Sequence, residues 1–226
     1  MIKSYILFLL ILATINGENF TLSGQMKFCD SKSNSFGKPL KLLKNNQVVK
    51  NKIVPDYSGE FTIDNLEKGE YVIEYENIYK QIIRKKINLE NSQTSIELCL
   101  DDFIDTKIST LFNTLKDGDS LSINIDGAGC FHSFEDKMTF YRKKGKYFAE
   151  TKNAKYKTIV KSIDAEKLNY LILWEKQAKQ INKVDGFCTS NAFYEFKLNS
   201  VSKFKVHDGT CNWDGYTKVR SKIFGF

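Results

Sequence analysis

Short runs of alternating apolar and polar residues fill the first part of the chain. Each run is long enough for a strand and too short for a helix, and turn-forming residues separate the runs at 44–47, 55–59 and 67–69. This pattern predicts a small antiparallel β-sandwich of two sheets over residues 18–100. The expected strands are centred on Phe20–Leu22, Met26–Phe28, Leu40–Leu42, Val48–Val49, Phe61–Ile63, Tyr71–Tyr75, Ile82–Ile87 and Ile96–Leu98.

The remainder of the chain mixes strands with one clear helical segment. Between Asp164 and Ile181, apolar residues recur every three or four positions, which predicts an amphipathic helix with Asp164 as its cap and Gly186 as its stop. Residues 101–116 are expected to join the two parts and to be partly helical. The whole predicts a mainly β protein, in which a small α+β domain with one main helix follows the sandwich. Its expected strands are Leu121–Ile125, Met138–Phe140, Tyr147–Ala149, Lys157–Val160, Phe193–Leu198 and Val201–Val206, with a short closing helix over Tyr216–Phe224.

The first seventeen residues have the pattern of an export signal. Lys3 precedes an apolar run at 5–13, and a short polar stretch ends at Gly17. The run is shorter than the roughly 20 residues that span a bilayer, and no later segment is apolar enough to act as a membrane anchor. We therefore predict a signal peptide over 1–17 that is cleaved after Gly17, and a secreted or periplasmic mature protein.

Composition and charge narrow the class of protein further. The 226 residues are 42% hydrophobic and 27% charged, with 13 Gly and 2 Pro, which excludes a disordered, collagen-like or coiled-coil chain. The length allows two domains, predicted at 18–100 and 101–226. The formal net charge is +7, with most of the excess in the second half. An exported basic protein is expected to meet anionic glycans or lipid headgroups and no nucleic acid, although dispersed lysines are more often a solvated surface.

One stretch of the sandwich resembles a known family. Residues 56–73 read DYSGEFTIDNLEKGEYVI, in which an Asp-to-Gly turn, a Phe-led strand, a Gly turn and a Tyr-led strand follow one another; Ser23-Gly24 and 37–40 match as well. This pattern resembles the carboxypeptidase regulatory-like, prealbumin-like domains over about 80 residues. The resemblance implies a spacer, adhesive or glycan-binding module with no chemistry of its own. It departs at 77–79, where family members usually have Gly followed by an aromatic residue.

Five cysteines are expected to pair in an oxidising compartment. Cys29 and Cys99 lie on the first and last strands of the predicted sandwich, so a bond between them is one prediction, with two buried thiols as the alternative. Cys188 and Cys211 flank the hairpin at 193–206 and form the preferred second pair. Cys130 is then left over.

Both histidines lie close in sequence to cysteines, which leaves a chemical alternative open. Cys130, His132, His207 and Cys211 are the residue types that bind zinc, and Cys130 with either imidazole would also suit a thiol nucleophile. Cys-x-His is a tight spacing, and no Cys-x-x-Cys pair is present. We therefore expect structural roles for these residues, with no metal or other cofactor.

A loop at 208–216 is the other candidate site. It combines carboxylates, an amide, aromatic rings and two glycines, a composition suited to Ca²⁺ or to stacking on a sugar ring. A core anchor is the favoured role of its tryptophan. The candidate binding residues are Asp208, Asn212, Trp213, Asp214 and Tyr216.

These patterns together favour an exported, non-catalytic protein for binding, adhesion or surface assembly, with an unknown extracellular or envelope partner. One alternative is a metal-dependent or thiol enzyme that uses Cys130, His132, His207 and Cys211. The other is a protein that binds carbohydrate or lipopolysaccharide through its basic second half.

Overall fold

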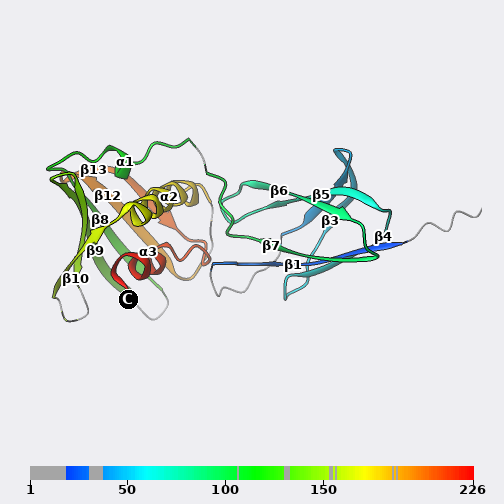
Figure 1. The fold of residues 1–226 in the computed structure, drawn as a ribbon. Coiled ribbons are helices and arrows are strands. Elements are labelled where there is room, and N and C mark those ends of the chain that lie inside the picture. Colours follow the sequence, from blue (N-terminus) through cyan, green and yellow to red (C-terminus); the bar gives the residue numbers. More distant parts are fainter. Residues whose placement is uncertain are drawn as a thin grey trace, which may run out of the picture.

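The computed structural model describes residues 19–30, 38–105, 107–129, 133–152, 155, 157–184, 186 and 188–226. The predicted signal peptide therefore lies outside the described residues. The fold is mainly β, as predicted (Figure 1). A β-sandwich forms one end of an elongated molecule, and a six-stranded sheet with helices forms the other. Within the described residues, no helix is long and apolar enough to cross a membrane.

The sandwich consists of a three-stranded sheet in the order β4-β1-β7 and a four-stranded sheet in the order β3-β2-β5-β6. Alternate side chains point into one core between the sheets, as with Tyr71, Ile73 and Tyr75 on β5. The strands are β1 (Phe20–Lys27), β2 (Leu40–Lys44), β3 (Gln47–Ile53), β4 (Glu60–Leu66), β5 (Gly69–Glu76), β6 (Ile82–Leu89) and β7 (Gln93–Cys99).

One strand pair of the sandwich departs from a wholly antiparallel arrangement. β1 is antiparallel to β4 but parallel to β7, with Thr21 opposite Gln93 and Lys27 opposite Cys99. Because parallel strands end at the same edge of a sheet, the ends of β1 and β7 lie together. The disulfide between Cys29 and Cys99 joins them there.

A tight contact between β1 and β4 explains the glycine in the Ser23-Gly24 motif. Gly24 lies opposite Phe61, and a Cβ on Gly24 would overlap the Phe61 ring and lie 2.9 Å from Ile96. The ring covers the space that a side chain would need. A glycine is therefore required because of the close packing and not because of its backbone angles.

Replacing Gly24 with valine is expected to destabilise the sandwich by about 1–3 kcal/mol, because overpacking displaces the Phe61 ring. Urea denaturation of the purified protein would measure this loss. Thr62→Ala, at an exposed position on the same strand as Phe61, is the control and should change stability little. A second variant that combines Gly24→Val with Phe61→Leu should recover part of the loss. Full additivity of the two changes would contradict the proposed contact.

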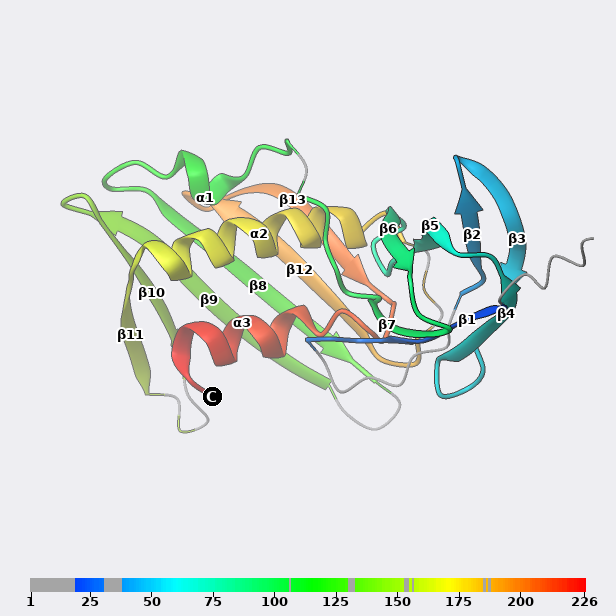
Figure 2. The ribbon, with the colours of Figure 1, turned by 45° about the vertical axis from the view of Figure 1, so that its right-hand side comes forward.

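The second half of the chain folds around the six-stranded sheet. Its order is β11-β10-β9-β8-β12-β13, and every neighbouring pair is antiparallel. α2 and α3 lie over the same face of this sheet (Figure 2). The elements are α1 (Leu111–Thr114), β8 (Ser120–Ala128), β9 (Ser133–Lys143), β10 (Lys146–Lys152), β11 (Thr158–Ile163), α2 (Ala165–Ile181), β12 (Asn191–Leu198), β13 (Val201–Asp208) and α3 (Gly215–Phe224).

The main helix begins where the sequence predicts and ends earlier. The Asp164 carboxylate accepts a hydrogen bond from the Lys167 N–H at 2.8 Å, which caps α2. The helix stops at Ile181 and not near Gly186: the N–H groups of Lys183 and Val184 bond to carbonyls three residues back, which closes turns and does not continue the helix. The Asn182 side chain accepts a hydrogen bond from the backbone N–H of His207 on β13. Gly186 instead lies so close to Gly209 that a side chain there would overlap its carbonyl.

The sandwich contacts the second half of the chain through the turn between β5 and β6. The Asn77 side chain is buried and accepts hydrogen bonds from the N–H groups of Tyr79 and Gln81 at 2.9 and 2.8 Å. This carboxamide therefore holds the turn between β5 and β6. Tyr79 is 1% exposed and belongs to the core of the second half, where the Gln180 amide donates to its carbonyl at 3.0 Å.

Candidate functional site

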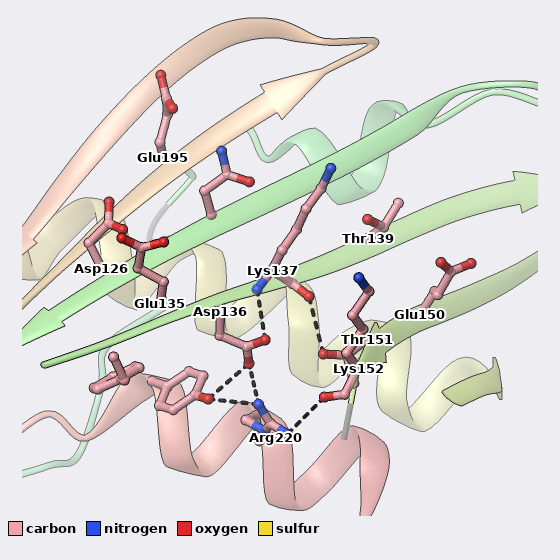
Figure 3. Close-up of a pocket in the computed structure, with 13 residues that line it drawn as sticks. Asp126, Glu135, Asp136, Lys137, Thr139, Glu150, Thr151, Lys152, Glu195 and Arg220 are labelled. Atoms are coloured by element: carbon pink, nitrogen blue, oxygen red, sulfur yellow. Dashed lines mark hydrogen bonds and ion pairs between the residues drawn. The ribbon is translucent and has the colours of Figure 1, made fainter. Parts of the chain in front are cut away.

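A pocket of about 970 Å³ lies where the backbone pairing of β9 and β10 ends (Figure 3). The two strands pair from Lys143 and Lys146 down to Thr139 and Glu150, and both continue beyond that last pair. Nearly all the lining side chains are polar or charged. They are Asn124, Asp126, Phe134, Glu135, Asp136, Lys137, Thr139, Glu150, Thr151, Lys152, Glu195, Tyr216 and Arg220.

The residues at the rim of the pocket lie on the face of the six-stranded sheet opposite the helices. On β9, Met138 and Phe140 are buried in the core beneath α2 and α3, so the alternate residues Glu135, Lys137 and Thr139 point the other way. On β8, the same alternation turns Asn124 outward. The described residues place no helix over this outer face. The rim is therefore open to a ligand from solvent.

The floor of the pocket is a cluster that joins α3 to β9. The Tyr216 hydroxyl donates to Asp136 at 2.8 Å, and Arg220 pairs with the same carboxylate and donates to the Tyr216 oxygen at 2.7 Å. Burial first, and the hydrogen bond to Asp136 second, raise the pKa of Tyr216 to about 12. The hydroxyl therefore keeps its proton at neutral pH, and the three side chains are held in one arrangement.

An aromatic pair fixes one wall of the pocket. The Phe134 ring stacks on the Tyr216 ring with 4.8 Å between centroids. Phe134 also covers Gly127 on the neighbouring strand, where a Cβ would overlap the ring. The glycine thus lets the ring lie flat against β8 and close the wall.

The charge of the pocket differs from that of the chain. Five lining residues are acidic, namely Asp126, Glu135, Asp136, Glu150 and Glu195, and three are basic, namely Lys137, Lys152 and Arg220. Two of the acids are already paired, Asp136 with Arg220 and Glu195 with Lys197. Although the whole chain has a net charge of +7, this pocket has no positive excess to attract a polyanion.

A second pocket of about 250 Å³ adjoins the first and shares Asp126 and Glu195 with it. It also contains a flat ring pair, in which Phe193 stacks on His207 with 4.5 Å between centroids and 6° between planes. His207 is held in place by its Nε2, 2.9 Å from the Asn191 side-chain oxygen. Its lining residues are Asp126, Asn182, Phe193, Tyr194, Glu195, Lys205, Val206 and His207.

The structure separates the five binding candidates predicted from the loop at 208–216. Tyr216 lines the larger pocket, whereas the Trp213 ring is fully buried and stacks on Trp174, so it is a core anchor and offers no platform for a ligand. Asp208 closes a local turn by accepting from the Thr210 N–H and hydroxyl, and Asp214 is the residue before α3. Asn212 also lies outside both pockets. The loop therefore does not form a single site.

Both predicted disulfides are present, Cys29 with Cys99 and Cys188 with Cys211. The alternative zinc set of Cys130, His132, His207 and Cys211 loses one ligand in this structure, because Cys211 is bonded to Cys188 and has no free thiolate for a metal. Cys130 and His132 lie outside the described residues. Among the residues that the structure does describe, no group of three His, Cys, Asp or Glu is arranged to hold a metal ion.

Sequence reasoning missed most of the pocket. Asn124, Lys137 and Thr139 alternate with buried apolar residues, so the strand pattern places them on the exposed face. That signal was available in the sequence. Nothing in the sequence shows that the backbone pairing of β9 and β10 ends at Thr139, or that α3 reaches the pocket from the other side of the sheet.

Comparisons with known proteins identify no family for this chain. No family model matches the chain, and no curated protein matches it. One similar solved structure is BcpA, the major pilin subunit of Bacillus cereus, at 11% identity and a TM-score of 0.35, over 85% of this chain and 69% of that chain. A similarity of this size carries no argument about function.

Proposed function

We propose that this chain is an exported, non-catalytic binding or adhesion protein, and that the pocket between β9 and β10 binds carbohydrate. The observation that carries the proposal is the pocket lining, which offers amide, hydroxyl, ammonium and carboxylate groups around a space of about 970 Å³. Sugar hydroxyls both donate and accept hydrogen bonds, so a wall that mixes donors with acceptors suits them. An apolar ligand would leave these groups unpaired.

Two further features support an exported binding protein. Two disulfides are typical of an oxidising compartment outside the cytoplasm. The resemblance of residues 18–100 to carboxypeptidase regulatory-like domains favours a spacer or adhesive role for the sandwich, which would then present the second half to its ligand. We thus propose that the protein is secreted, that its sandwich is a carboxypeptidase regulatory-like domain, and that it has no catalytic activity.

A panel of immobilised polysaccharides tests the proposed function. Mannan, xylan and β-glucan are neutral probes, and dextran sulfate and chitosan are charged comparators. We expect the protein to bind at least one neutral polysaccharide, and the double variant Asn124→Ala/Thr139→Ala to bind it about tenfold more weakly, since two hydrogen bonds are lost. Thr62→Ala on the sandwich is the matched control and should bind normally.

Two outcomes would contradict the proposed function. Failure to bind any polysaccharide of the panel would remove carbohydrate as the ligand. Release of shorter sugars from a bound polysaccharide, followed by chromatography, would show catalysis and would favour the enzyme alternative instead.

A further inference from the structure

The two pockets on the outer face are parts of one continuous surface. Asp126 and Glu195 line both pockets, and they lie on the neighbouring strands β8 and β12. Asp126 is directly opposite Phe193, and Asn124 is directly opposite Glu195. The residues that the two pockets share therefore lie on a single pair of adjacent strands.

The combined surface crosses five strands. It begins at Glu150 on β10, passes over β9, β8 and β12, and ends at His207 on β13. Four steps between neighbouring strands, each about 4.8 Å, give a length of roughly 19 Å. This is longer than a single sugar ring, so the surface has room for a chain of several units laid across the strands.

The smaller pocket contributes a stacked pair of aromatic rings to this length. The Phe193 side chain is 48% exposed, and its ring is held nearly parallel to the His207 ring. Asn191 fixes the imidazole in turn, so the platform exists before any ligand arrives. The apolar face of a pyranose ring packs well on the face of Phe193 that His207 does not cover, while its hydroxyl edge reaches the polar groups beside it.

The smaller pocket, like the larger one, contains charges of both signs. Glu195 lies between Lys197 at 2.7 Å and Lys205 at 3.8 Å, and these lysines hold the pKa of the carboxyl below its usual range, chiefly through the hydrogen bond from Lys197. Neither pocket therefore presents a field of one sign. A chain with a charge on every unit would gain little on this surface and would lose the hydration of its charges.

We infer that the two pockets are neighbouring subsites of one groove, which binds a linear, uncharged oligosaccharide across the strands, with the Phe193–His207 ring pair as the stacking platform of its far end. The inference rests on the proposed carbohydrate binding and adds the length, charge and direction of the ligand. Short sugars occupy the larger pocket, and longer chains reach the ring pair.

Oligosaccharides of one to six units, prepared from mannan, xylan and β-glucan, test the groove by titration calorimetry. For the native protein, we expect affinity to rise at least tenfold between the two-unit and the longest chains. Phe193→Ala should remove this gain and leave the affinity for short chains unchanged, because stacking is worth about tenfold in affinity. Tyr57→Ala, which removes a ring that is 90% exposed on the sandwich, is the matched control and should keep the gain.

The possible results separate the groove from the proposed function. One result would contradict only the groove: a polysaccharide binds and Asn124→Ala/Thr139→Ala weakens this binding, but affinity depends neither on chain length nor on Phe193. Carbohydrate binding in the larger pocket would then still be supported. If dextran sulfate or chitosan binds more tightly than every neutral chain, the inferred uncharged ligand is wrong. If no carbohydrate binds at all, both proposals fail. Melting curves of the variants should match the native curve, since Phe193 lies outside both cores.

Discussion

Replacing Tyr79 with alanine is expected to lower the free energy of unfolding by about 3–5 kcal/mol, the usual cost of deleting a large buried aromatic side chain. Tyr79 comes from the turn between β5 and β6 of the sandwich, yet it is 1% exposed within the core of the second half. Its ring packs edge-on against Phe103 with 4.9 Å between centroids. The variant therefore leaves a cavity where the two halves meet.

We also expect the loss of Tyr79 to weaken the packing between the sandwich and the second half of the chain. Denaturation in guanidinium chloride measures the stability, and small-angle X-ray scattering measures the spread of overall dimensions, which we expect to broaden. Tyr57→Ala is the control, because this exposed tyrosine lies on the same sandwich and its removal should cost less than about 0.5 kcal/mol. A loss below about 1 kcal/mol for Tyr79→Ala, with unchanged scattering, would show that the turn does not hold the halves together.

Glu175→Ala is expected to cost about 3–5 kcal/mol as well, for an electrostatic reason. Glu175 on α2 is fully buried, and its carboxylate accepts hydrogen bonds from the N–H groups of Leu111 and Phe112 at 2.8 and 3.2 Å. It also pairs with Lys179 at 2.7 Å. Alanine leaves two backbone donors and an ammonium group without this acceptor, and α1 loses its attachment to α2.

Two variants of α2 isolate the cause of that loss. Glu175→Gln keeps an acceptor oxygen but loses the charge, so we expect a smaller cost of about 1–3 kcal/mol. Glu166→Ala removes a surface carboxylate that pairs with Lys222 at 2.8 Å and should cost less than about 1 kcal/mol. Equal stabilities of Glu175→Ala and Glu166→Ala in thermal or chemical denaturation would mean that the buried carboxylate does not organise α1.

Local pattern was sufficient to predict most of the elements. Alternation in runs such as Tyr71–Tyr75 places every second side chain in a core, and a spacing of three and four over 164–181 indicates a helix. The mainly β fold is confirmed on this basis. The domain boundary near residue 100 stays a prediction. The two hydrophobic cores agree with such a boundary, but Tyr79 crosses from the sandwich into the second core.

The disulfides were predictable because they depend on few residues. Cys29 and Cys99 lie on the first and last strands of the sandwich, and Cys188 and Cys211 flank one hairpin, so little had to be known beyond the strands themselves. The parallel pairing of β1 with β7, which brings the first two cysteines together, was not predicted. Strand direction depends on the path of the whole sandwich, and no local pattern encodes it.

Most residues of the candidate site could not be predicted from the sequence. Tyr216 was chosen as part of a loop with Trp213, but the two rings have opposite roles, one lining the pocket and one filling the core. Their difference arises because α3 packs against the sheet and turns Tyr216 toward Asp136, a residue 80 positions away in the chain. A contact of that kind is specified by packing and not by neighbouring residues.

By itself, the sequence determined which residues face a core and which segments are strands or helix, because these depend on periodicity and on neighbours along the chain. It indicated the two cysteine pairs but left alternatives to them open. Tertiary structure alone decided that the backbone pairing of β9 and β10 ends at Thr139, that α3 forms the floor of the pocket there, and that Tyr79 of the sandwich lies in the core of the second half. Each of these results from the packing of elements far apart in sequence, where side-chain volume and buried hydrogen bonds select one arrangement.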